Sequence, residues 1–232
     1  MRSKGVILGV LAGIVICGTA AAQSVTSLAK ISNQDAVQAL KDALVQGSGR
    51  AVSQLSAPDG FLGNPKVRIP LPDTIKRVES GLRMIGMGRQ ADELVTSMNR
   101  AAEMAVKEAT PLLVSSVKSM SVSDAKGILT GPDDAATQYF RRTTSGVLTQ
   151  RFVPIVKQAT GRVQLAQQYN GLAGQAAQYG LISKEDANID LYVTRKALDG
   201  LFLVIAEQER AIRRDPMGAA TSVAKKVFGT LR

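Results

Sequence analysis

Apolar residues recur at helical spacing along almost the whole chain, and this feature constrains the fold more than any other. In residues 190–214, apolar side chains follow one another every three or four positions, the spacing of one face of an α-helix. Asp215-Pro216 predicts where that helix ends. The same pattern indicates further helices in residues 33–55, 73–85, 89–109, 121–129, 132–149 and 155–179. We therefore predict an all-α fold, an irregular multi-helix bundle.

Glycine and proline predict where these helices break. Gly47-Ser-Gly49 is expected to kink or end the first helix, and Pro154 to interrupt the helix that precedes it. Gly131-Pro-Asp-Asp134 predicts a helix start, with proline at the first helical position and Asp133 and Asp134 in the first turn.

Residues 57–72 differ from the rest of the chain. They are rich in proline and glycine at positions typical of turns, while Val67 and Ile69 alternate like a short edge strand. We predict a Pro/Gly-rich loop here, with room for one short strand.

The first 22 residues have the pattern of an export signal. Arg2 and Lys4 give a basic start, Val6–Cys17 is apolar, and three alanines ending at Ala22 form a small-residue cleavage site. A membrane anchor would need about 20 apolar residues, and this stretch is shorter. We expect cleavage after Ala22, a periplasmic location, no transmembrane helix thereafter, and a single helical domain in residues 23–232 whose first ten residues are flexible.

Composition excludes several kinds of site from the mature chain. Cleavage removes Cys17, the sequence's single cysteine, and there is no histidine or tryptophan. Without Cys or His the chain cannot form a zinc site, a haem attachment, a disulfide, or a Ser-His-Asp or Cys-His active site. Catalysis would have to use carboxylates, Lys, Tyr, Ser or Thr, and no cofactor is expected.

The chain is basic, and this bears on its partners. Its formal net charge of +10 falls to +8 when Arg2 and Lys4 leave with the signal. Anionic lipids and cell-envelope polymers suit such a charge. Nucleic acid is not expected as a partner, because the basic residues are scattered and only four Tyr and five Phe are present. A lipid or an envelope protein is the candidate.

Two glutamates stand out against the helical pattern. Glu103 falls nearly opposite the apolar stripe of its helix, with Asn99 beside that stripe, so a surface pair with Lys107 is the simplest expectation unless another element covers this face. Glu209 falls within about 20° of the centre of the apolar stripe of the last helix. A carboxylate there is costly unless paired, so an ion pair with Arg213 is predicted, and a ligand-binding or acid–base role is the alternative.

Three acids lie close together in the middle of the chain. Asp124, Asp133 and Asp134 do not have the spacing of a calcium-binding loop. Capping of helix starts, with Ser121 or Ser123 as a further cap, accounts for them.

An ordered series of short motifs extends from the loop to the last helix. The motifs are Asp59-Gly-Phe61, Ile69-Pro-Leu-Pro72, Asn99-Arg-Ala-Ala-Glu103, Asp124-Ala, Asp134-Ala-Ala-Thr137, Tyr139-Phe140, Tyr192-Val-Thr194, Ala197-Leu, Gly200-Leu-Phe202, Glu209 and Ile212-Arg213. Together they resemble an uncharacterised bacterial exported-protein family, domain of unknown function 4197. The resemblance implies an exported, mainly helical protein and supplies no catalytic residue.

The polar members of these motifs are the candidate site residues. They are Asn99, Glu103, Asp124, Asp134, Thr137, Tyr139, Tyr192, Thr194, Glu209 and Arg213. Two arrangements are open: the residues form one buried polar network, or they line a shared groove.

Three functions follow from these observations. A non-enzymatic binding or interaction protein for a hydrophobic or anionic ligand or an envelope partner is favoured, because the commonest catalytic side chains are missing. A carboxylate-dependent hydrolase or lyase would need two of Glu103, Asp124 and Glu209 in one pocket, within about 10 Å of each other, with Tyr139 as a hydrogen-bond donor. A structural component of an envelope assembly would show a broad exposed apolar patch.

Overall fold

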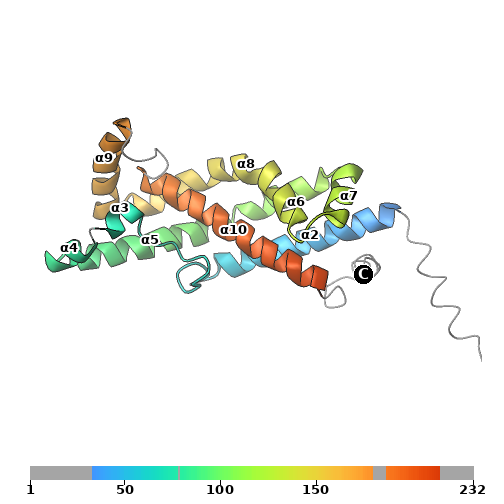
Figure 1. The fold of residues 1–232 in the computed structure, drawn as a ribbon, viewed down its shortest axis with the longest axis horizontal. Helices are drawn as coiled ribbons and strands as arrows, with labels where there is room; N and C mark the ends of the chain where they lie inside the picture. Colours follow the sequence, from blue (N-terminus) through green and yellow to red (C-terminus); the bar gives the residue numbers. More distant parts are fainter. Residues whose placement is uncertain (1–32, 78, 180–186, 215–232) are drawn as a thin grey trace, which may run out of the picture.

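The computed structural model is an elongated bundle of helices (Figure 1). It describes residues 33–77, 79–179 and 187–214. The predicted export signal and the segment expected to be flexible lie outside these ranges. Within them the chain is helical and contains no strand, so the predicted all-α class is confirmed.

Four long helices form the body of the bundle, and shorter ones stand at its ends (Figure 1). The long helices are α2 (Asn33–Ser56), α5 (Gly88–Val106), α8 (Ala135–Thr160) and α10 (Ile189–Arg214). The shorter helices are α3 (Asp73–Lys76), α4 (Glu79–Met84), α6 (Ala109–Lys118), α7 (Val122–Thr130) and α9 (Gln164–Gln178). Apart from α9, which stands across one end, the chain therefore follows the long axis of the molecule back and forth.

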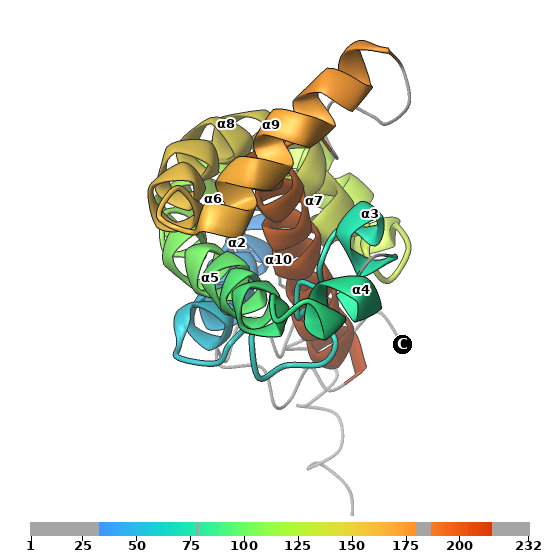
Figure 2. The ribbon, with the colours of Figure 1, turned by 90° about the vertical axis from the view of Figure 1, so that its left-hand side faces the viewer.

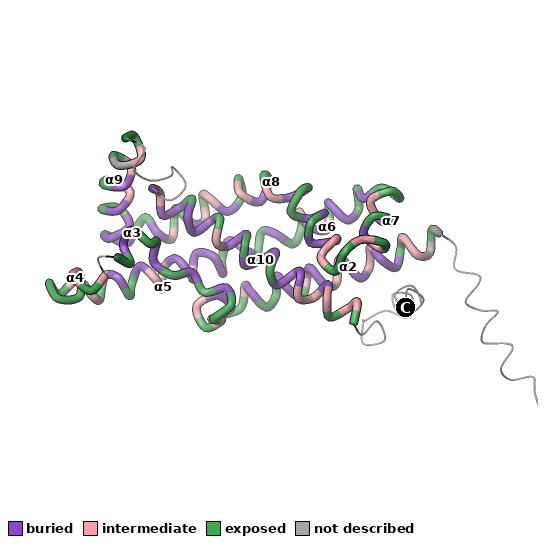
Figure 3. Tube along the Cα trace, in the orientation of Figure 1, coloured by how far each residue is buried: buried purple, intermediate pink, exposed green. Residues whose placement is uncertain are grey.

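The last long helix, α10, organises the packing. It contacts α8, α5 and α2, which lie along one flank of it in the end-on view (Figure 2). The faces that these helices turn toward one another carry the buried residues (Figure 3). Phe61, Phe140, Phe152 and Phe202 are the largest fully buried side chains in this core, and burying each contributes about 1.5–3 kcal/mol. The opposite flank of α10 stays outside the core.

Two predicted breaks do not occur. Helix α2 continues through Gly47 and Gly49, where the Ser48 hydroxyl donates a hydrogen bond of 2.7 Å to the carbonyl of Leu44 within the helix. Helix α8 continues through Pro154 to Thr160. Pro154 lies on the exposed face of α8, so water can satisfy the carbonyl that loses its N–H partner there. Helical packing on the inner face thus overrides both local breakers.

Residues 57–72 form the predicted loop but not the predicted strand. Val67 and Ile69 are buried, as the alternation suggested. Asp59 adopts a φ of 64°, and Gly60 sits so close to the end of α2 that a Cβ there would be 2.4 Å from the carbonyl oxygen of Leu55. The alternation of Val67 and Ile69 with exposed residues therefore reflects a loop that packs against helices. It does not reflect pairing with a second strand.

In the described part of the chain, every helix is too short or too polar to cross a membrane.

Candidate functional site

Glu209 is buried at the point where α10 passes the beginning of α8. Its side chain is only 6% exposed. One carboxylate oxygen accepts hydrogen bonds from the backbone N–H of Ala136 and from Arg213 Nη2, and the other accepts them from the N–H and the hydroxyl of Thr137, all at 2.9 Å. The predicted pair with Arg213 is present. Glu209 also satisfies two N–H groups in the first turn of α8, where the helix dipole favours negative charge.

Arg213 extends this contact to a third helix. Its Nη2 also donates to the carbonyl of Ile128 near the end of α7, at 2.9 Å. The arginine side chain is 15% exposed, and it forms a partly buried bridge between α10 and α7. Glu209 and Arg213 therefore hold three helices together.

The contact from Glu209 also explains where α8 begins. The sequence predicted a start at Gly131-Pro132 with Asp133 and Asp134 in the first turn, but α8 begins at Ala135 and its first turn contains no acid. Asp134 occupies the cap position without capping, and its carboxylate instead accepts from the side chain of Gln138 at 2.8 Å. The prediction was wrong because a carboxylate from α10 takes the N–H groups that Asp133 and Asp134 were expected to serve.

Glu103 makes a second buried contact of the same kind. The residue is 5% exposed, whereas the helical pattern predicted a surface position. One carboxylate oxygen accepts from the N–H groups of Phe61 and Leu62 at 3.1 and 3.2 Å, and the other accepts from Arg100 at 2.7 Å. The predicted pair with Lys107 is replaced by this one, because the loop 57–72 covers this face of α5.

Arg100 carries the ion pair on to the loop. Its second nitrogen donates to the Asp59 carboxylate at 2.8 Å. Hydrogen bonds to Glu103 and then Asp59 raise the pKa of the Arg100 guanidinium above its ordinary value. Sequence reasoning missed Asp59 and Arg100 as members of this cluster, although both stand inside the motifs that it singled out.

Asn99 holds the other end of the loop. It is fully buried, and its side-chain amide donates to the Ile69 carbonyl at 2.9 Å and accepts from the Ile69 N–H at 2.8 Å. The amide thus pairs with the backbone as a neighbouring strand would. Its second N–H donates to the Val95 carbonyl at 2.8 Å. Asn99 and Glu103 together fix the loop on α5.

The remaining candidates have local roles. Asp124 forms a capping box with Ser121, and hydrogen bonds from the Ser121 hydroxyl and N–H hold the pKa of its carboxyl below the usual range. The Tyr139 hydroxyl donates to the Ser116 carbonyl at 2.8 Å, and that of Tyr192 to the Pro70 carbonyl at 3.2 Å.

Thr194 is the exception among them. It is buried, and its hydroxyl has no hydrogen-bond partner in the described part of the chain. The ten candidates therefore form several separate contacts rather than one network, and most of them bind backbone groups of distant segments.

An open groove lies between the segments that these contacts hold. It has a volume of about 540 Å³ and is lined by three parts of the chain: residues 66–70 of the loop, the beginning of α8, and residues 196–210 of α10. Gly200 lets the loop reach α10, since a Cβ there would be 2.8 Å from the Phe61 ring. Of the candidate residues, Asp134 and Thr137 line the groove.

The groove is basic. Its lining contains more basic than acidic residues. The basic residues are Lys66, Arg68, Arg141, Lys196 and Arg210, and the acidic residues are Asp134 and Asp199. Lys66 pairs with Glu207 at 2.7 Å, and Arg141 pairs with Asp199 at 3.4 Å while lying over the Phe202 ring at 4.7 Å. Among the described residues, no carboxylate pairs with Arg68, Lys196 or Arg210.

Sequence reasoning missed Lys196 and Arg210 because they lie on the outer face of α10, away from its apolar stripe. The signal that could have found them is the spacing of Lys196, Asp199, Leu203 and Arg210 by three, four and seven residues, which marks a second stripe on α10.

The described residues contain no group of three acidic side chains placed to hold a metal ion. The site is thus a basic groove whose walls are anchored by buried side chains of the long helices. These features define an all-α bundle protein with carboxylate-anchored groove walls.

The chain belongs to the protein family of unknown function DUF4197, whose family model matches residues 30–229. No curated protein and no solved structure gave a match.

Proposed function

We propose that the protein is a non-enzymatic binding protein of the bacterial periplasm, and that the groove beside α10 holds an anionic ligand. The observation that carries this proposal is the set of three cations, Arg68, Lys196 and Arg210, that line one groove without an acidic partner among the described residues. Unneutralised like charges repel one another at close range. An anion that enters the groove would relieve this repulsion and gain charge-assisted hydrogen bonds.

The surface beneath the cations supports a ligand with an apolar part. Phe202, Leu203 and Ala206 line the same groove, and Leu203 is exposed although it is a leucine. A purely inorganic anion would leave this apolar surface in water. An organic anion would cover it, and covering apolar surface contributes about 25 cal/mol per Å².

The buried clusters are positioning residues in this proposal. Asn99 and Glu103 hold the loop that supplies Lys66 and Arg68, and Glu209 holds the start of α8 that supplies Asp134 and Arg141. Rigid walls lower the entropy cost of ligand binding.

The carboxylate-dependent hydrolase has less support. Glu103 and Glu209 are each occupied by backbone N–H groups and an arginine, and Asp124 caps its own helix. A general acid or base has to reach a substrate proton, and these contacts leave each carboxylate committed to the fold.

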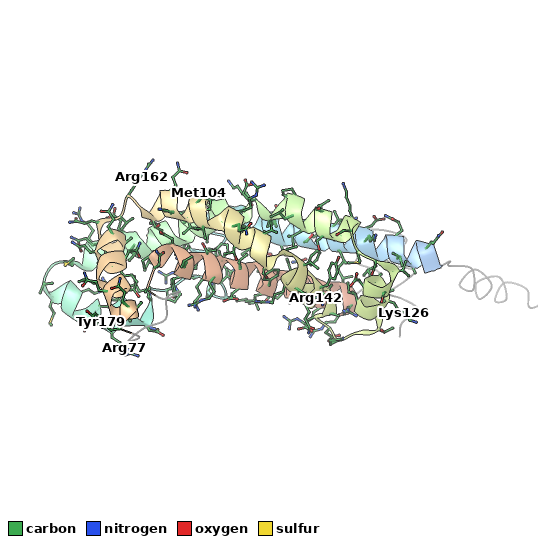
Figure 4. The ribbon with its side chains drawn as sticks, turned by 90° about the horizontal axis from the view of Figure 1, so that it is seen from above. Arg77, Met104, Lys126, Arg142, Arg162 and Tyr179 are labelled. Atoms are coloured by element: carbon green, nitrogen blue, oxygen red, sulfur yellow. The ribbon has the colours of Figure 1, made fainter. Side chains whose placement is uncertain are left out.

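Binding of 8-anilinonaphthalene-1-sulfonate, an apolar ring system with a sulfonate, tests the proposal by fluorescence titration. The double reversal Arg68→Glu with Arg210→Glu is compared with the control reversal Lys126→Glu with Arg162→Glu, which changes the net charge equally. Neither Lys126 nor Arg162 lines the groove, and Figure 4 shows the two side chains at opposite ends of the bundle. We expect at least tenfold weaker binding in the groove variant alone. Equal affinity in both variants would refute the proposal.

A further inference from the structure

A second hollow, of about 270 Å³, adjoins the groove between α8 and the first half of α10. Arg141, Asp199 and Phe202 line both spaces. We propose that the two spaces form one elongated site for an amphiphile with an anionic phosphate headgroup and a single acyl chain. This inference rests on the proposed function, because it names the ligand class of the same groove.

The floor of the elongated site is one continuous surface of α10. It extends from Leu191 in the hollow to Arg210 in the groove, which is about 28 Å at a rise of 1.5 Å per residue. A lipid chain in one leaflet spans about half of a hydrocarbon core of about 30 Å, that is about 15 Å. The floor is therefore long enough for one extended chain together with its headgroup.

The chemistry of the floor changes along this length. The groove end carries four cations that do not line the hollow, Lys66, Arg68, Lys196 and Arg210, whereas Arg195 is the cation that lines the hollow alone. The hollow is lined largely by apolar surface that includes Leu191 and Leu198, and Leu191 is 37% exposed. Apolar side chains that line a hollow while facing solvent are the surface that an acyl chain would cover. Headgroup and chain are thereby assigned to opposite ends.

Arg141 lies where the groove and the hollow meet. The guanidinium of Arg141 lies over the Phe202 ring at 4.7 Å, and because both residues line the groove and the hollow, this cation stands at the boundary between the two spaces.

The size of the hollow favours one chain over two. At about 270 Å³ it lies at the lower end of the range of about 300–1,000 Å³ for ligand pockets. A diacyl lipid would have to leave its second chain in water. The expected ligand is therefore a lysophospholipid-like anion.

Calorimetric titration of the full-length mature protein with three probes tests this inference. The probes are lysophosphatidylglycerol below its micelle concentration, lysophosphatidylcholine with the same chain, and glycerol 3-phosphate, which is the headgroup chemistry alone. We expect lysophosphatidylglycerol to bind at least tenfold more tightly than either of the others. Comparable binding of lysophosphatidylcholine would overturn the anionic headgroup.

Glycerol 3-phosphate that binds as tightly as the lysolipid would overturn the acyl chain and leave the proposed anion groove standing. Absence of binding by all three probes, while 8-anilinonaphthalene-1-sulfonate still binds at Arg68 and Arg210, would overturn the phosphate lipid alone. Loss of that sulfonate binding as well would overturn both proposals.

A matched pair of variants locates the chain. Leu191→Asn should weaken lysophosphatidylglycerol binding about tenfold and leave glycerol 3-phosphate binding unchanged. Met104→Asn is the control, because Met104 is 44% exposed and projects from the same distant edge as Arg162 (Figure 4). Both positions are on helix surfaces, and circular dichroism verifies that each variant is folded. Equal affinity of the two variants for the lysolipid would overturn the placement of the chain.

Discussion

Replacing Glu209 with alanine should destabilise the protein far more than replacing any exposed glutamate of the same helix. Glu209→Ala removes an acceptor that makes four hydrogen bonds of 2.9 Å, to Ala136, to Thr137 twice and to Arg213. The N–H groups at the start of α8 would then be buried without a partner, and Arg213 would be left as a buried cation without its carboxylate. The loss of stability in this variant therefore measures how much the Glu209 carboxylate contributes to the free energy of unfolding.

The size of the effect follows from these contacts. Leaving a buried donor unsatisfied costs about 1–3 kcal/mol, and removing one partner of a buried ion pair costs about 3–5 kcal/mol. The two costs overlap, because the same carboxylate accepts from the N–H groups and pairs with the arginine. The cost is also reduced because the Arg213 side chain is 15% exposed to water and retains its hydrogen bond to the Ile128 carbonyl. We expect a loss of about 3–4 kcal/mol, which is a large part of the about 5–15 kcal/mol that stabilises a typical domain.

Urea denaturation followed by circular dichroism measures the free energy of unfolding, and Glu207 provides the control. Glu207 lies two positions before Glu209 on α10, and its ion pair is with Lys66, whose side chain is 64% exposed against 32% for Glu207. Glu207→Ala should cost about 0–1 kcal/mol, as surface pairs do. If the two alanine variants lose similar stability, the anchoring role of Glu209 is refuted. A gain of stability in Glu209→Ala would instead indicate a carboxylate kept for binding or catalysis at the expense of the fold.

Three further predictions concern the loop and a helix cap. Gly200→Ala should cost about 1–3 kcal/mol in urea denaturation, because the new methyl group would meet the Phe61 ring at 2.8 Å, and Phe61→Leu in the same chain should recover part of that loss. Asn99→Ala should cost about 2–4 kcal/mol and make residues 57–72 the first site of proteolytic cleavage, since a buried N–H and C=O of the loop lose their partner; cleavage at an unchanged rate would contradict this. Ser121→Ala should raise the pKa of Asp124 toward its ordinary value, as carbon-13 NMR titration would show. In the unmodified protein the lowered pKa of Asp124 stabilises the folded state above about pH 4, and that contribution is lost as the pH falls through the folded pKa, so the serine variant should lose less stability on acidification.

Sequence periodicity predicted the long helices well, because each of them buries one face. The last helix was predicted over residues 190–214 and extends over Ile189–Arg214. Its boundaries follow local chemistry, a polar start and a proline after the end. The errors at Gly47, Pro154 and the start of α8 have one cause: contacts from other helices override the local preference of glycine, proline and aspartate.

The sequence identified the residues of the candidate site but did not predict how they are arranged in space. A helical projection compares a residue only with its own helix, so it placed Glu103 on the surface and Glu209 in the core. Both are buried, because segments 42 and 73 positions away in the sequence bring backbone N–H groups to them. The same projection hid the groove, since Lys196 and Arg210 belong to the outer face that a search for apolar stripes disregards.

The buried carboxylates explain how a basic groove can persist on a small helical bundle. Apolar side chains could fill the positions of Glu103 and Glu209 at less desolvation cost, but apolar contacts do not fix the direction of a backbone. Each carboxylate instead fixes two successive N–H groups, at Phe61 and Leu62 in the loop and at Ala136 and Thr137 in α8. The loop and the beginning of α8 are two of the three segments that line the groove, and each carries basic residues that face the others across it. The polar residues inside the bundle thereby hold basic residues on its surface in one place, and this is the physical basis on which we propose an anionic ligand.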